Sequence, residues 1–101
     1  MARLDKAAIA ASLTASLPAT IDETGVADLV ADHGQIIVAA DAASIDPAIA
    51  RLRPLPGRRW IAINPGDLFV ASPKTIGTKV GIMDPSGRVL KNADLPRPTT
   101  S

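Results

Sequence analysis

The chain has 101 residues, enough for one small domain, and it contains no cysteine, which excludes a disulfide framework and thiolate chemistry. Alanine supplies much of the apolar content, and the chain has only one Trp, one Phe and no Tyr, so we expect a thin core that a partner surface completes. No apolar run is long enough to span a bilayer, and the N-terminus does not resemble a signal peptide, so we expect no contact with a membrane.

The net charge of +1 hides an uneven distribution along the chain. Residues 1–50 carry two bases against seven acids, a net charge of −5, and residues 51–101 carry nine bases against three acids, a net charge of +6. Two such halves can neutralise each other within one chain. They can also pair between identical neighbours that are arranged head to tail.

The first predicted element is a helix over residues 4–17. Ile9, Leu13 and Leu17 recur at i, i+4 and i+8, the alanines between them favour a helix, and Pro18 ends it. Because this apolar stripe is narrow, the helix should pack on one surface only. We expect that surface to be the chain's own sheet, with a neighbouring subunit as the alternative.

Residues 19–33 are acidic and fit two descriptions. They predict either a β-hairpin across the turn at residues 22–25 or a loop followed by a short helix that Thr24 caps. Gly25 and Gly34 bracket a short run that contains Val26 and Val30, and this pattern favours the strands.

The next segment predicts one strand and one helix. Gln35–Ala40 is a continuous apolar run with three β-branched residues, which is typical of a buried strand. Asp46 is placed to accept hydrogen bonds from a helix that begins at Pro47, and Pro54 ends that helix.

Residues 58–90 hold the only Trp and the only Phe, and we predict that they form a β-rich body. Strands are expected at residues 60–63, 68–71, 79–83 and 88–91. Asp84–Gly87 has the pattern of a type I turn that ends in a left-handed glycine, which predicts a hairpin. The closely spaced glycines at 77, 81 and 87 are typical of bulges and bends, and they favour a curled sheet.

These elements predict a single α+β domain that is mainly β. A short N-terminal helix occupies residues 1–17, and a small curled antiparallel sheet or partly open barrel with long loops occupies residues 18–91. Residues 92–101 contain two prolines and no periodicity, so they should form an extended C-terminal arm.

The sequence contains no pattern that is typical of an enzyme or of a cofactor site. His33 is the only histidine, and without cysteines or a cluster of acids it reads as an exposed loop residue rather than a metal ligand. The glycines match neither a dinucleotide-binding loop nor a P-loop, and no nucleophile elbow surrounds a serine. We therefore expect no catalytic residue, no metal and no cofactor, and we expect that the protein is not an enzyme.

The best candidate for function is a basic segment that also contains two prolines and a glycine, which should make it stiff and exposed. Its interaction candidates are Arg51, Arg53, Arg58, Arg59 and Trp60. Arginine binds phosphate and carboxylate groups through a planar fork, so non-specific contact with a DNA backbone is one use of this segment. The near-neutral charge and the scarcity of aromatic residues argue against a module that reads nucleic-acid sequence.

A second use of the basic segment is to dock on the acidic half of an identical subunit. The acidic candidates for that contact are Asp22, Glu23, Asp28 and Asp41. This interpretation accounts for the charge asymmetry better than DNA contact does. A solvated basic loop with no partner is the remaining interpretation.

The order of these elements resembles that of the small head–tail connector proteins of tailed bacteriophages, of the stopper or head-completion type. The matching stretches are the helix at residues 4–17, the strand at 35–40 and the run at 60–90 with its late hairpin. The resemblance is one of layout, and it carries over no individual residue. It implies a non-enzymatic subunit of a ring, with identical copies and neighbouring virion proteins as partners, located in the virion after synthesis in the host cytoplasm.

Two alternatives stay open beside the connector. The chain could be a capsid decoration protein, or a small monomeric β-barrel adaptor that binds a peptide or an acidic ligand along residues 51–60. An adaptor outside a virus should be cytoplasmic. A thermal midpoint that rises with protein concentration would distinguish an assembling protein from a monomeric adaptor.

Overall fold

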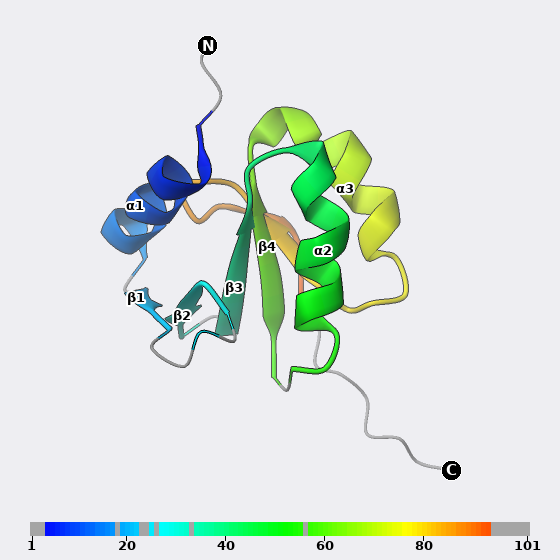
Figure 1. Cartoon of the computed structure of the whole chain (residues 1–101), viewed down its shortest axis with the longest axis horizontal. Coiled ribbons are helices and arrows are strands. Elements are labelled where there is room, and N and C mark those ends of the chain that lie inside the picture. Colours follow the sequence, from blue (N-terminus) through cyan, green and yellow to red (C-terminus); the bar gives the residue numbers. More distant parts are fainter. Residues whose placement is uncertain are drawn as a thin grey trace.

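The computed structural model describes residues 4–17, 19–22, 25, 27–32, 34–55 and 57–93. Its elements, in chain order, are α1 (Lys6–Ser16), β1 (Thr20–Ile21), β2 (Leu29–Ala31), β3 (Gly34–Ala39), α2 (Ala42–Leu52), β4 (Arg59–Ile63), the 3₁₀ helix η1 (Pro65–Asp67), α3 (Leu68–Thr75), β5 (Gly81–Met83) and β6 (Val89–Lys91). Within these residues, six strands form one open sheet in the order β1-β2-β3-β4-β5-β6 (Figure 1).

The centre of the sheet is parallel and its two sides are antiparallel. β3 pairs with β4, and β4 with β5, in parallel, and the connections between them contain α2 and α3. On one side β1, β2 and β3 form an antiparallel meander, and on the other side β5 and β6 form a hairpin. This pattern follows from the connections, because parallel neighbours need a long crossover whereas antiparallel neighbours need only a turn.

Helices cover both faces of the central strands. One face packs against α1, and the other packs against α2 and α3. Side chains alternate between the two faces, so that in β4 Trp60 and Ala62 belong to the α1 side whereas Ile61 and Ile63 belong to the side of α2 and α3. Burial on both faces explains why the sequences of β3 and β4 are continuous apolar runs.

The predicted N-terminal helix is confirmed, and it packs on the chain's own sheet. Asp5 caps α1, because its Oδ1 accepts a hydrogen bond of 2.8 Å from the backbone N–H of Ala8. Ile9 and Leu13 are fully buried against the sheet. The preference for strands over a helix in the acidic segment is also confirmed, since β1 pairs with β2.

The predicted hairpin at Asp84–Gly87 is confirmed as the connection between β5 and β6. The N–H of Gly87 donates to the carbonyl of Asp84 over 3.0 Å, and Gly87 has φ = 85°, a conformation that glycine adopts without strain. The strands predicted around β3, β4, β5 and β6 are confirmed as well.

The predicted curled antiparallel sheet or barrel is wrong. The protein is α+β with helices and strands in rough balance, and its sheet is open and mixed. The main cause is the segment at residues 68–71, which was expected to be a strand but forms the first turn of α3. A run of four apolar residues does not distinguish a strand from a short helix, and the crossover from β4 to the parallel strand β5 requires a helix.

The predicted start of the second helix is also wrong. α2 begins at Ala42, and its cap is Asp41, whose Oδ1 accepts from the N–H of Ser44 over 2.9 Å. Pro47 therefore lies inside the helix rather than at its first position. Asp46 is an exposed helical residue, and it pairs with Lys74 of α3 over 2.7 Å.

Some expectations concern residues outside the described ranges. These are Glu23, His33 and residues 94–101 of the predicted C-terminal arm. Among the helices that the structure describes, none has the length and apolar character that crossing a membrane requires.

Candidate interaction surfaces

Open α/β sheets usually bind ligands beyond the carboxyl ends of their parallel strands. In this protein the polar residues that follow those ends are Asp41, Asn64 and Asp84. Asp41 caps α2, and the Oδ1 of Asp84 accepts from the N–H groups of Ser86 and Arg88 over 2.9 and 3.0 Å. Both carboxylates therefore order the turns in which they lie.

Asn64 has a structural role at the same edge. Its side chain is buried, its Oδ1 accepts from the N–H of Leu4 over 3.0 Å, and its Nδ2 donates to the carbonyls of Leu4 and Ala40, both over 2.9 Å. The amide thus binds the segment before α1 to the ends of β3 and β4. The hydrogen bonds of Asp41, Asn64 and Asp84 thus hold the backbone together at this edge.

Arg59 and Trp60, two of the predicted interaction residues, are buried in the protein itself. Arg59 is 3 % exposed and its guanidinium donates to three carbonyls, with Nη1 on Leu52 and Arg53 at 3.3 and 3.1 Å and Nη2 on Thr78 at 2.7 Å. It joins the end of α2 to the loop before β5. Burial lowers the pKa of Arg59, because the charged form loses hydration.

The other three arginines of the basic segment are exposed. Arg51 lies in the last turn of α2, where its Nη2 donates to the carbonyl of Gly25 over 3.4 Å and its Nη1 lies 3.7 Å from a carboxylate oxygen of Asp28. Arg53 and Arg58 lie in the loop between α2 and β4. The segment therefore supplies exposed cations from three positions and a structural cation from the fourth.

The predicted acidic residues also bind this chain. Oδ2 of Asp22 accepts from the N–H of Ala27 over 2.9 Å, which orders the turn between β1 and β2. Oδ2 of Asp28 accepts from the N–H of Val38 over 2.9 Å, and its Oδ1 lies 3.4 Å from Lys6. β2 pairs with β3 only as far as Ile36, so no residue of β2 lies opposite Val38. The N–H of Val38 donates to the carboxylate of Asp28 in place of a carbonyl on a neighbouring strand.

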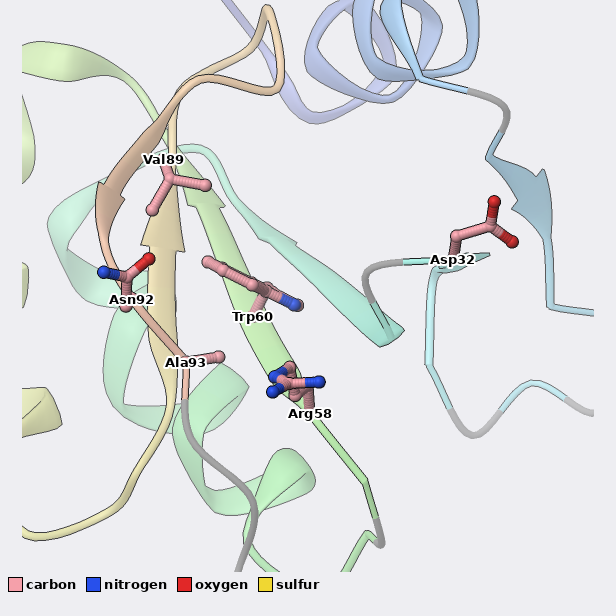
Figure 2. Close-up of a pocket in the computed structure, with 6 residues that line it drawn as sticks. All are labelled: Asp32, Arg58, Trp60, Val89, Asn92 and Ala93. Atoms are coloured by element: carbon pink, nitrogen blue, oxygen red, sulfur yellow. The ribbon is translucent and has the colours of Figure 1, made fainter.

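A groove of about 550 Å³ lies on the α1 side of the sheet, next to the exposed part of the basic segment. Trp60 and Arg58 line its middle, Asp32 lies on the side of the turn between β2 and β3, and Asn92 and Ala93 lie on the side of β6 (Figure 2). Trp60 rests against Gly81 of β5, where any added Cβ would lie 2.5 Å from the indole ring. The groove thus has a nearly buried indole beneath it and a cation, an anion and an amide around it.

A second surface is the outer side of α3, which we call the α3 apolar face and which consists of Phe69, Pro73 and Ile76. These residues follow one another at i, i+4 and i+7, and all three are exposed. The exposed fractions of Phe69 and Ile76 are 89 % and 72 %. Large apolar side chains at such exposure mark a contact site when they gather on one face.

Sequence reasoning missed the α3 apolar face because it assigned residues 68–71 to a strand. The predicted strand ends at residue 71, so Ile76 falls outside it and is not grouped with Phe69. In a helix, the spacing of four and seven residues puts both on one side with Pro73. The spacing of four and seven residues is visible in the sequence, but it marks a shared face only when the segment is assigned to a helix.

A third exposed surface is the edge formed by β1 and β2, at the opposite side of the molecule from α3 (Figure 1). Ile21 is 74 % exposed there, and Val30 of β2 is exposed as well. The exposed acid Asp32 follows β2 directly. Ile21 lies opposite Leu29 and so on the α1 side of the sheet, whereas Val30 lies opposite Thr20 and points to the other side.

The described residues contain no group of three or more His, Cys, Asp or Glu side chains arranged to hold a metal ion. Comparisons of the chain with protein-family models, with curated proteins and with solved structures found no match.

Proposed function

We propose that the protein is a non-enzymatic assembly protein whose copies associate through the α3 apolar face. The observation that supports this most directly is the exposure of Phe69 in α3 and of Ile76 at the C-cap of the same helix. Complete burial of two such side chains stabilises a complex by roughly 1.5–3 kcal/mol each, before the entropic cost of association. The commitment of the polar groups beyond the parallel strands to backbone hydrogen bonds supports the absence of catalysis.

The partner of the α3 apolar face is the edge of β1 and β2 on a second copy. That edge exposes Ile21 and lies beside the acid Asp32, whereas α3 carries Lys74, which pairs with Asp46 within the same copy. Exposed apolar side chains thus lie at opposite ends of one molecule. A contact between two different surfaces is heterologous, and it produces a ring if the rotation closes and a filament if it does not.

Within this proposal, the assembly is a ring of the kind that tailed bacteriophages build between head and tail. The layout of the chain supports it, with one N-terminal helix, a glycine-punctuated C-terminal half and proline-containing loops. The sheet is open and mixed, so the resemblance does not include a β-barrel. Neighbouring virion proteins, and non-specific contact of Arg53 and Arg58 with a DNA backbone, belong to the same proposal, and a capsid decoration protein is its closest variant.

The α3 apolar face is tested by removing its side chains. We expect Phe69→Ser and Ile76→Ser each to weaken self-association by about tenfold or more, because each loses most of its buried apolar area. Light scattering after gel filtration, over a range of protein concentrations, gives the masses. Ala50→Ser replaces an exposed apolar residue on α2 and should leave association unchanged.

A wild-type protein that stays monomeric at every concentration would contradict self-assembly. So would an association that Phe69→Ser and Ala50→Ser change equally. Because Phe69 is almost fully exposed in the monomer, its replacement should alter the free energy of unfolding by less than about 0.5 kcal/mol, and a loss of mass then reports the contact rather than misfolding.

A monomeric adaptor is the second candidate function, and the groove between Asp32 and Asn92 favours it. The groove lies on the α1 side of the sheet, whereas α3 packs on the other side. The groove and the α3 apolar face are therefore separate surfaces, and the groove shares only Asp32 with the edge of β1 and β2.

A further inference from the structure

The polar side chains that line the groove differ from most of those described above because they are uncommitted. Within the described part of the chain, the side chains of Asp32, Arg58 and Asn92 make no hydrogen bond or ion pair. By contrast, Arg59 donates to three carbonyls, and Asp28 and Asn64 bind backbone groups. Three unused polar groups of different chemistry surround one cavity, which is the arrangement of a binding site.

The shape of the groove favours a chain over a small molecule. Sites for small molecules bury most of the ligand surface, whereas this cavity is open to solvent along one side. The lining residues spread from the turn before β3 to the end of β6, across the face of β4 (Figure 2). A peptide can cross such a surface with one side against the lining residues and the other side in water.

We propose that the groove binds an extended peptide segment of a partner protein, and that this segment carries a carboxylate side chain. The guanidinium of Arg58 pairs with a carboxylate side chain of the peptide through its planar fork. The amide of Asn92 both donates and accepts, so it pairs with a peptide backbone group. The carboxylate of Asp32 accepts from a peptide N–H or from a basic side chain, which sets the direction of the peptide across the groove.

The proposal can be tested with synthetic peptides and fluorescence polarisation. The probe is a fluorescein-labelled hexapeptide, TVEVTK, and the comparison peptide TVQVTK has glutamine in place of glutamate. The titration uses the full chain with Phe69→Ser, so that the result does not depend on self-assembly. We expect TVEVTK to bind about tenfold more tightly than TVQVTK, because a hydrogen bond to a charged group contributes roughly 1.5–3 kcal/mol.

Two variants assign the binding to the groove. Arg58→Gln should remove the preference for glutamate and weaken TVEVTK about tenfold, and Asn92→Ala should weaken both peptides equally. Arg53→Gln removes the same charge from an exposed position outside the groove and should have little effect.

Equal losses for Arg58→Gln and Arg53→Gln would overturn the proposal, since they would show attraction to net charge only. Equal affinities for the two peptides, or no binding at millimolar peptide, would also overturn it. None of these results tests the contact made by Phe69 and Ile76, because those residues are not part of the groove; Asp32 is the residue that the groove shares with the edge of β1 and β2.

Discussion

At the scale of the residue, Arg58 and Arg59 show how neighbours with the same side chain acquire opposite roles. Arg58 is exposed beside the groove, and Arg59 is buried beneath the end of α2. The alternation of β4 explains the difference, because Arg59 lies two residues before Ile61 and so faces the side of α2 and α3. The sequence identifies both arginines as notable, but it does not tell which of them a helix will cover.

We predict that Arg59→Met strongly destabilises the protein. The substitution removes the guanidinium donor from the carbonyls of Arg53 and Thr78 and one of two donors from that of Leu52, which still accepts from the N–H of Leu55. It also removes a cation from the C-terminal end of α2. We expect the free energy of unfolding in urea to fall by about 2–4 kcal/mol. Arg59→Lys should recover only part of this loss, because one ammonium group does not reach both the helix end and the loop.

Arg53→Met is the matched control for this measurement. Its side chain is exposed, so we expect a change within about 0.5 kcal/mol. If Arg59→Met were as mild as Arg53→Met, the guanidinium would not join α2 to the loop before β5 in solution.

At the scale of the element, the sequence predicts the strands and α1 well because their signals are local. Ile9 and Leu13 mark one face of a helix, and Asp84–Gly87 fits one type of turn. The crossover helices are harder to predict because each contains a proline, Pro47 in α2 and Pro73 in α3. Proline inside a helix removes one hydrogen bond, so the usual rule places a helix boundary there, whereas packing against the sheet keeps both helices intact.

We predict that Asp41→Ala destabilises the protein by about 1 kcal/mol, because α2 loses its N-cap. Asp46→Ala should cost less than about 0.5 kcal/mol, because Asp46 only forms an exposed ion pair with Lys74. Urea denaturation of the two variants measures both values. The reverse order, with the larger loss for Asp46→Ala, would mean that α2 begins at Pro47 and not at Ala42.

At the scale of the whole molecule, the two halves of the chain neutralise each other only in part. Lys74 pairs with Asp46, and Arg51 and Lys6 both approach Asp28, so acidic and basic segments do interleave. The exposed acid Asp32 remains beside β2, and the elements β1 and α3, which carry the exposed Ile21 and Phe69, lie on opposite sides of the molecule (Figure 1). The parallel centre of the sheet could not be predicted from the strands alone, because it depends on α3 being a crossover helix.

Head-to-tail assembly makes a prediction that other modes of association do not share. A copy with Phe69→Ser retains the edge of β1 and β2, and a copy with Ile21→Ser retains the α3 apolar face. Each variant alone should lose assembly, because every contact needs both surfaces. A mixture should form a one-to-one complex, because the intact face of one variant fits the intact edge of the other.

The first measurement is therefore sedimentation velocity of the Phe69→Ser and Ile21→Ser proteins, separately and mixed in equal amounts. The account predicts monomers in the separate samples and a species of twice the monomer mass in the mixture. A mixture that stays monomeric, although the wild-type protein associates, would contradict head-to-tail contact between α3 and the edge of β1 and β2.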